Sequence, residues 1–382
     1  MRTAILTSQS HGRPGNNSTR ISPSRIKVAR MRRGLTKTEL AADLDVTPST
    51  LSRWEEEGPP PKRTDSLLDR LSSSLNFPAD YFVASELEVP ALDSTLFRAG
   101  SRATQKQKSA AVASGANARP LVEWLRHNYN FPLPHVPDLS GLSPADAASH
   151  VRTIWQLGDR PFPNSIHLAE SVGVAVMGLP PAASAVDAFS MWEGEQPYIF
   201  LARRRTPEGT RFDLAHELGH LLLHSRANSS DATSREPEAD EFASNLLIPP
   251  NIVHAHLRVH PSLDDIFQLK RILKVSAMAM LRATYENGKL SEREYKNYLT
   301  ALSIRGFRKE EPGSQLQYER SRVFDYVLSS EGGASISGIA AVTKLPEQDL
   351  HALMLGSQPH AVGGSTTSAI TAPARPALRV VR

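Results

Sequence analysis

Two histidines four residues apart, His216 and His220, flank Glu217 in a largely apolar stretch of the chain. Residues at this spacing share one face of a helix, so both imidazoles can bind one zinc ion through ring nitrogens. Glu217 is placed to take a proton from a water molecule at the metal and to pass it on. The alternative is an ordinary amphipathic helix whose histidines face water. His224, one turn beyond His220, is expected to be solvated or hydrogen-bonded rather than a ligand.

The third metal ligand must be His, Asp or Glu, because the chain contains no cysteine. A second helix is predicted over residues 236–248, ending before two prolines. A glutamate from this helix would leave the fourth position open to water, the mark of a catalytic zinc, and Glu236 is the preferred one. Its spacing to Asp240 is similar to that in gluzincin peptidases, and Asp240 is expected to orient a ligand histidine. Glu238 and Glu241 remain alternative ligands.

Residues 197–202 are predicted to form a strand ahead of the histidine-bearing helix. In zinc peptidases the strand at this place often forms the edge of the substrate cleft. A substrate backbone could then pair with it by strand addition. The alternative is an ordinary strand of a sheet.

The first 60 residues contain the signals of three short helices. The first is expected at about residues 24–33, ended by Gly34. The second begins with a capping box at Thr36, and the third begins with Thr47 as N-cap followed by proline. Separated by a tight turn, the last two helices form a helix-turn-helix, whose third helix would enter the major groove of DNA.

Positive charge is concentrated in this region. Residues 1–63 contain 12 Lys and Arg against 6 Asp and Glu, whereas the whole chain carries a net charge of +4. Such an excess is the electrostatic footprint expected of DNA binding. The candidate phosphate contacts are Arg30, Arg32, Arg33 and Lys37. The candidates on the third helix for contacts with bases or phosphates are Thr47, Ser49, Thr50, Ser52 and Arg53. The alternative is a helical module that has lost DNA binding and docks onto proteins.

This module resembles the XRE family of phage-type regulators. The resemblance is carried by residues 34–41 and 46–55. It implies a double-stranded DNA operator as partner and, because XRE domains often bind palindromes as pairs, a homodimer. Lys37 stands where the family usually has a DNA-contacting glutamine, and Asp45 stands where glycine is usual. The base specificity of the family therefore does not transfer to this chain.

Residues from about 144 to 255 resemble the ImmA/IrrE family of metallopeptidases, above all through residues 211–224 and 236–249. The resemblance implies a zinc-dependent endopeptidase that cleaves a partner protein, typically an XRE-type repressor, and so changes gene expression. An XRE domain ahead of an ImmA/IrrE domain is also a known arrangement. The alternatives are a non-proteolytic regulator that uses the zinc site as sensor or scaffold, and an antitoxin-like regulator. A sensor needs the metal ligands but not Glu217.

Together these features predict an α+β chain, with an all-α helix-turn-helix domain, a mixed α/β zincin-like metallopeptidase domain and a C-terminal helical region. The expected borders are a disordered arm at 1–20, the helix-turn-helix domain at 21–85, a linker at 86–120, the peptidase domain at 121–300, helices at 301–358 and a disordered tail at 359–382. No apolar run is long enough to cross a membrane, and the N-terminus lacks the apolar core of a secretion signal. A cytoplasmic protein is therefore expected.

Overall fold

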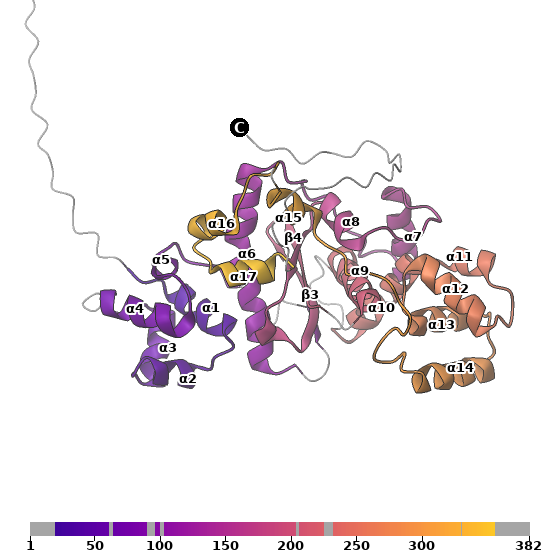
Figure 1. Ribbon diagram of the computed structural model, residues 1–382, viewed down its shortest axis with the longest axis horizontal. Coiled ribbons are helices and arrows are strands. Elements are labelled where there is room, and N and C mark those ends of the chain that lie inside the picture. The colour runs from indigo at the N-terminus through magenta and orange to yellow at the C-terminus, as the bar shows by residue number, and fades with distance from the viewer. Residues whose placement is uncertain are drawn as a thin grey trace, which may run out of the picture.

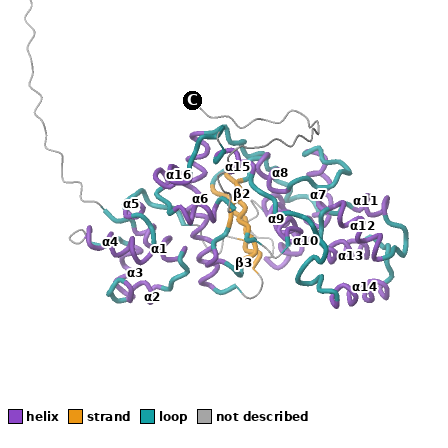
Figure 2. Tube along the Cα trace, in the orientation of Figure 1, coloured by secondary structure: helices purple, strands orange, loops and turns teal. Residues whose placement is uncertain are grey.

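The structure is a computed structural model that describes residues 20–60, 64–89, 96–99, 103–203, 206–224, 232–329 and 331–355. The predicted tail, and all but the last residue of the predicted N-terminal arm, lie outside the described residues. A helical N-terminal part, a central part with a sheet and a second helical part follow one another along the long axis (Figure 1). Helices predominate over strands in the described chain (Figure 2). The predicted α+β class is confirmed.

Five short helices form the described portion of the N-terminal part. They are α1 Pro23–Arg32, α2 Lys37–Asp43, α3 Pro48–Glu56, α4 Thr64–Leu75 and α5 Ala79–Phe82. The predicted capping box of α2 is confirmed, because Thr36 and Glu39 each bond to the backbone of the other. The predicted N-cap of α3 is confirmed as well, since the Thr47 hydroxyl accepts a hydrogen bond from the Thr50 amide. Asp45 has φ 49° in the turn between these helices, a left-handed conformation that aspartate tolerates.

The central part contains a four-stranded sheet with the order β1-β3-β4-β2. The strands are β1 Leu96–Ala99, β2 Ala175–Gly178, β3 Val186–Glu193 and β4 Gln196–Leu201. β3 pairs antiparallel with β1 and with β4, whereas β4 pairs parallel with β2. The strand predicted at 197–202 is therefore an interior strand with a neighbour on each side. The prediction that it forms the edge of the substrate cleft is wrong, and the alternative, an ordinary strand of the sheet, is confirmed.

The two faces of the sheet pack against different helices. On one face, alternate residues such as Met177, Phe189 and Phe200 join the core formed by the N-terminal part and the long helix α6 Gln105–Asn128. On the other face, Val176 and Ile199 join the core formed by α9 Pro207–Leu223 and α10 Ala232–Leu247. The sheet thus separates the histidine-bearing helix α9 from the helix that contacts the N-terminal part.

The structure corrects the predicted linker at 86–120. This segment contributes β1 and the beginning of α6, where Ala110, Val112 and Ala113 are buried. Small side chains are buried on nearly every side of this part of α6, so the sequence shows no amphipathic stripe there. A composition that suggests a connector therefore belongs to a core helix.

The remaining helices lie on both sides of the sheet. α7 Pro144–Ile154, α8 Ser165–Ser171, α11 Pro250–His256, α12 Leu263–Leu273, α13 Ala277–Glu286 and α14 Glu292–Ile304 belong to the side of α9 and α10. α15 Arg322–Val327, α16 Ile336–Thr343 and α17 Glu347–Leu353 return to the side of α6. None of the helices in the described part of the chain is long and apolar enough to span a bilayer.

Candidate functional site

Helix α9 carries both histidines of the predicted metal site. Thr206 caps its N-terminus by accepting a hydrogen bond from the Gly209 amide. Leu214 and Leu218 are fully buried in the core between α9 and the sheet. Their burial sets the rotation of the helix about its own axis. A Cβ at Gly219 would lie 3.0 Å from Phe242 Cδ1 on α10, so glycine at this position lets α9 and α10 approach closely.

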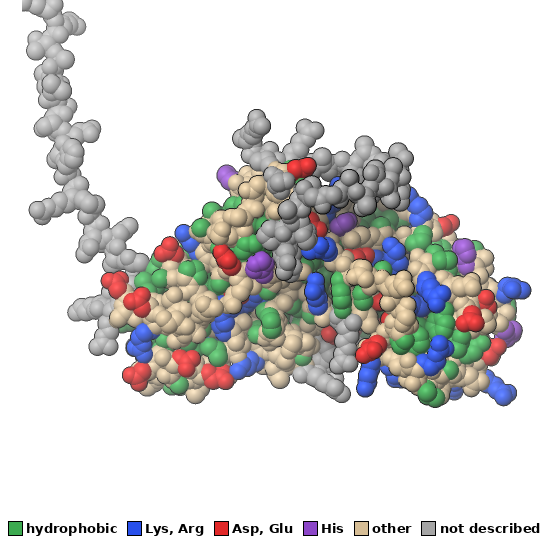
Figure 3. Space-filling model, viewed as in Figure 1, with side chains coloured by type: hydrophobic (Ala, Val, Ile, Leu, Met, Phe, Trp, Pro, Cys, Tyr) green, Lys and Arg blue, Asp and Glu red, His purple; other side chains and the backbone are tan. Residues whose placement is uncertain are grey.

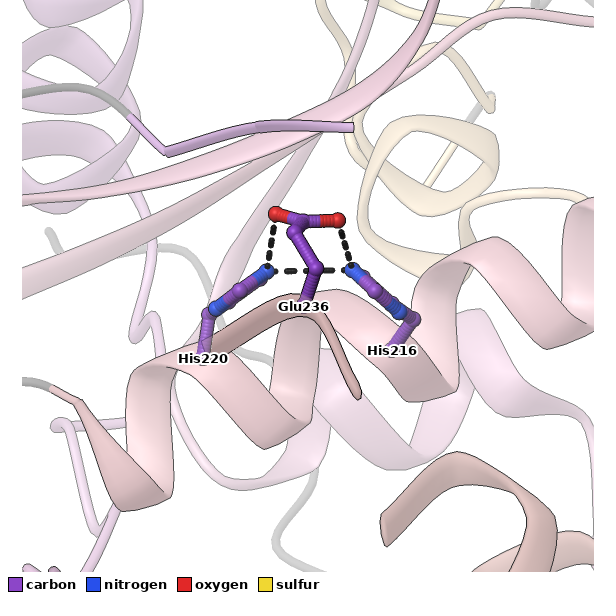
Figure 4. A group of neighbouring side chains, drawn as sticks. All are labelled: His216, His220 and Glu236. Atoms are coloured by element: carbon purple, nitrogen blue, oxygen red, sulfur yellow. Dashed lines mark hydrogen bonds and ion pairs between the residues drawn. The ribbon is translucent and has the colours of Figure 1, made fainter. Parts of the chain in front are cut away.

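The side chains of His216, His220 and Glu236 point toward one another (Figure 4). The two Nε2 atoms lie 3.0 Å apart. Glu236 Oε2 lies 3.4 Å from His216 Nε2, and Glu236 Oε1 lies 3.3 Å from His220 Nε2. The candidate ligand atoms of all three residues lie within 4.8 Å of one another. The structure therefore brings together, at the reach of one ion, the three residues that the sequence proposed as ligands.

Each histidine of the cluster is held at its other ring nitrogen. His216 Nδ1 lies 2.9 Å from Asp240 Oδ1, the partner expected from the sequence. His220 Nδ1 lies 2.9 Å from His224 Nδ1, and His224 Nε2 lies 2.9 Å from Glu238 Oε2. His224 is thus a buried, hydrogen-bonded residue, one of the two roles expected for it.

The alternative third ligands lie elsewhere. Glu238 is engaged with His224, which turns it away from the Nε2 atoms of the histidine pair. Glu241 is exposed on α10 and lines the neighbouring cavity. Among the acidic residues of α10, the described geometry therefore favours Glu236 as ligand.

The environment favours the neutral form of the His220 imidazole and the charged form of the Glu236 carboxylate. Burial lowers the pKa of His220 to about 4. Burial opposes ionisation of Glu236, but hydrogen bonds with His216 and His220 outweigh it and hold the pKa of Glu236 below its usual range. At neutral pH the His220 imidazole and the Glu236 carboxylate are therefore both in the form that a metal ion requires.

Glu217 is fully buried beside the cluster, and the Ser190 hydroxyl donates a 2.7 Å hydrogen bond to its Oε2. Ser190 lies on β3, so the sheet orients the carboxylate of a residue on α9. This contact was not predicted, because nothing in the pattern of β3 distinguishes Ser190 from an ordinary strand serine.

A cavity of about 1580 Å³ opens beside the cluster. Glu236 and Asp240 on α10 form one wall, and Arg282 on α13 and residues 307–311 contribute to others. The side chains of Glu236 and Asp240 are 47% and 45% exposed, whereas those of the two histidines are 1% exposed. In this cluster the two histidines are therefore buried, whereas Glu236 is open to the cavity.

The arginines Arg30 and Arg32 of α1, predicted to contact phosphates, do not face solvent. Arg30 is buried, and its guanidinium donates to both carboxylate oxygens of Glu55 at 2.5 and 3.0 Å. Arg32 is buried against Asp349 of α17 and donates to the Ser114 hydroxyl of α6 at 3.0 Å.

Arg33 is also engaged within the protein. Its guanidinium donates to both Asp349 oxygens, at 3.1 and 2.7 Å, and to the backbone carbonyls of Leu75 and Asn76. It also lies over the Phe77 ring, with its central carbon 4.4 Å from the ring centroid. The structure therefore argues against phosphate contacts by Arg30, Arg32 and Arg33, because their charges are matched inside the protein.

The candidates on the third helix lie at the surface. Thr47, Ser49 and Arg53 are exposed, and Thr50 and Ser52 are half-buried. Lys37 donates to the Ser52 hydroxyl at 2.8 Å, which places it beside α3. The surface around α2 and α3, at the lower left of the view, shows acidic as well as basic side chains (Figure 3).

Two family models match the chain. Residues 26–82 match the helix-turn-helix family, and residues 169–285 match the M78 peptidase family, described as the IrrE N-terminal-like domain. An uncharacterized immunity region protein 2 of Bacillus phage phi105 is 33% identical over 86 residues, which cover 20% of this chain and 54% of that protein. The chain thus spans about half the length of this relative. It combines an XRE-type helix-turn-helix domain with an IrrE/ImmA-like peptidase domain.

Proposed function

We propose that this chain, which joins an XRE-type helix-turn-helix domain to an IrrE-like M78 domain, is a DNA-binding regulator with a zinc-dependent endopeptidase. The peptidase would cleave a regulatory protein, with an XRE-type repressor as the preferred class, and so change gene expression. The observation that carries the proposal is the convergence of His216, His220 and Glu236 beside the buried Glu217.

The donor set fits zinc. Two imidazoles and one carboxylate are a ligand set of hydrolytic zinc centres, in which the fourth position is left to water and substrate. The contacts of His216 with Asp240 and of His220 with His224 occupy the Nδ1 atoms, so that both Nε2 atoms point toward the place of the ion. A zinc ion held there would act as a Lewis acid on water and on a substrate carbonyl.

Glu217 would act as general base and then as general acid. Its carboxylate takes a proton from the attacking water, the water oxygen bonds to the peptide carbonyl carbon, and the proton is passed to the amide nitrogen as the C–N bond breaks. Ser190 holds the carboxylate in one orientation. The cavity beside Glu236 is large enough for several residues of an unfolded polypeptide, which supports a protein substrate.

The proposed DNA-binding surface is the exposed side of α3 with the start of α2. It consists of Lys37, Thr47, Ser49, Thr50, Ser52 and Arg53. The side chains at the N-terminal end of α3 would approach base edges in the major groove. A homodimer on a palindromic operator is part of this proposal.

A trapping experiment tests the peptidase proposal. Glu217→Gln keeps all three ligands and removes the base, so the zinc-loaded variant should retain a bound protein substrate that the wild type releases as fragments. The captured protein is then incubated with zinc-loaded wild type, with chelator-treated wild type and with the variant. We expect cleavage by the first only, with a loss of at least about 10²-fold for the variant.

Two results would contradict the proposal. Cleavage by Glu217→Gln at the wild-type rate would remove Glu217 from the mechanism. A captured protein that zinc-loaded wild type leaves intact would favour the zinc site as a sensor or scaffold.

A further inference from the structure

Strand β3 contacts Glu217 directly. Ser190 of β3 donates to Glu217 at 2.7 Å, and β3 packs directly on α9. One edge of β3 is paired with β4, and the other edge faces β1. A segment that pairs with this second edge therefore lies next to β3, the strand whose Ser190 orients the proposed general base Glu217.

β1 occupies that edge. Its four residues pair antiparallel with β3, with Leu96 opposite Ser190 and Phe97 opposite Phe189. The pairing becomes irregular between Arg98 and Ala99. A backbone segment paired with the outer edge of a sheet is the arrangement by which extended peptides bind to proteins. In Figure 4 a purple segment, the colour that Figure 1 gives to this part of the chain, ends above the three side chains.

The pairing of β1 with β3 is short, but the chain on both sides of β1 keeps the strand near β3. It pairs over four residues on one side only, whereas β3 and β4 pair over six. Short edge strands are among the least stable parts of a sheet. The chain is anchored before β1, where the Tyr81 hydroxyl donates to Asn117 of α6 at 2.9 Å, and again after it by α6 itself. β1 is therefore presented to β3 intramolecularly, without the entropy cost of a separate encounter.

We infer that β1 is a substrate of the chain's own peptidase: the protein hydrolyses one peptide bond within residues 96–99. This inference rests on the proposed function and names its substrate, an extended segment of the same chain between the DNA-binding domain and the peptidase. The cut would separate the helix-turn-helix domain from the covalent chain of the peptidase.

The reaction is a peptide hydrolysis that consumes one water. The water oxygen forms a bond to the carbonyl carbon of the cleaved residue, and the C–N bond to the next residue breaks. Glu217 takes a proton from the water and delivers it to the departing nitrogen. The products are a new carboxylate on the N-terminal fragment and a new amino group on the C-terminal fragment.

The test follows the intact mass of the purified full-length chain after zinc is added to metal-free protein. We expect two fragments whose junction lies within residues 96–99, at a rate per chain that stays constant over a tenfold range of protein concentration. Glu217→Gln should remain intact. A junction elsewhere, or a rate that rises in proportion to concentration, would overturn the inference.

Two proline variants provide a matched pair. Because N–H groups alternate along a strand, only one of Phe97→Pro and Arg98→Pro removes a hydrogen bond to β3. We expect self-cleavage to fall at least tenfold in one variant and much less in the other. Hydrogen exchange of residues 96–99, measured with Glu217→Gln also present so that no cleavage occurs, should be faster in the same variant. Equal behaviour of the two variants in both measurements would contradict pairing as the basis of recognition.

Cleavage of the protein's own chain and cleavage of the captured protein can be measured separately. Wild type that stays intact with zinc while it cleaves the protein captured by Glu217→Gln would overturn self-cleavage and leave the peptidase in place. Wild type that cleaves neither its own chain nor the captured protein would overturn both.

Discussion

Among single residues, the proposed metal site depends on the groups that hold its two histidines at Nδ1. His220 is followed by a chain of two further groups, His224 and Glu238. If His220 offers Nε2 to a metal, its Nδ1–H donates to His224 Nδ1, and His224 Nε2–H then donates to the Glu238 carboxylate. This chain fixes the tautomer of His220 in the form that binds metal.

His224→Ala should therefore weaken zinc binding without removing a ligand. We expect the zinc dissociation constant to rise about 10–100-fold, the usual cost of losing such a partner. The measurement is a competition titration against a chromogenic chelator. His254→Ala, at an exposed histidine of α11, is the control and should leave the constant unchanged. An unchanged constant in His224→Ala would show that the chain of hydrogen bonds does not support the ligand.

Some residues of this site can be predicted from the sequence, and others cannot. His216, Glu217 and His220 follow from spacing along one helix, which is a local property. Ser190 and the pairing of His224 with Glu238 depend on how β3 and α10 pack against α9, and no local pattern encodes that packing. The sequence therefore predicts the candidate ligands and Glu217. It does not predict the contacts of Ser190 and Glu238 that orient these groups.

At the scale of elements, helix α1 shows why a count of basic residues misleads. Three of its arginines contributed to the predicted positive charge, but the structure pairs them with Glu55 and Asp349 or buries them. Counting charges along a sequence does not reveal which face of a short helix is covered by distant elements. The helix starts at Thr36 and Thr47 were predictable because capping is local.

The exposed residues of α3 should then dominate DNA recognition. Arg53→Ala should weaken binding to an operator obtained by in vitro selection by about 1–3 kcal/mol, the cost expected for a lost base contact. Fluorescence anisotropy at fixed salt measures the change. Lys27→Ala, at an exposed position of α1 away from α3, is the control. Equal affinities of wild type and Arg53→Ala would exclude Arg53 from the interface.

The junction of α8 and α15 should make stability depend on pH. Burial raises the pKa of Glu170 from 4.5 to about 7, although Ser321, Arg322 and Val323 donate hydrogen bonds to its carboxylate. A folded-state pKa above the unfolded value means that the folded state holds the proton more tightly. Stability is therefore lost as pH rises from about 4.5 to about 7.

Glu170→Gln should remove this loss, because the glutamine has no proton to release. Thermal denaturation at several pH values between 4.5 and 7.5 measures it. We expect the melting temperature of wild type to fall relative to that of the variant as pH rises. The corresponding loss in the free energy of unfolding is about 1.4 kcal/mol per unit of difference between the folded and unfolded pKa of Glu170. A constant difference between the two proteins across this range would show that Glu170 does not titrate there.

At the scale of the whole molecule, the DNA-binding part is docked onto the rest by a buried ion pair. Arg32 and Asp349 have side chains that are each 2% exposed, although 317 positions separate them in the sequence. Arg33 binds the same carboxylate. The domain borders expected from composition missed this docking, because the contact joins the beginning of the chain to its last described helix.

Asp349→Ala should loosen the docking, because it leaves the buried Arg32 charge without its carboxylate. Removing one partner of a buried pair costs about 3–5 kcal/mol. We expect a lower melting temperature and faster hydrogen exchange in α1. Glu347→Ala, an exposed acidic residue on the same helix, should change the stability by no more than about 0.5 kcal/mol. Similar effects of the two variants would contradict the proposed docking role of Asp349.

The same docking bears on the consequence of self-cleavage. Once β1 is cut, the N-terminal fragment should stay bound through α1, α6 and Asp349, so that the fragments elute together in gel filtration. In Asp349→Ala, the N-terminal fragment should separate. Separation of the wild-type fragments would show that the covalent connection, rather than the ion pair, holds the DNA-binding part in place.

We propose that His216, Glu217, His220 and Glu236 together form the active site of a peptidase. The most direct test compares new protein N-termini, by mass spectrometry, in host cells that express wild type or Glu217→Gln at equal levels. We expect new termini that arise only with wild type, including one within residues 96–99 of the chain itself. The same set of termini with both proteins, while each carries one zinc ion per chain, would contradict it.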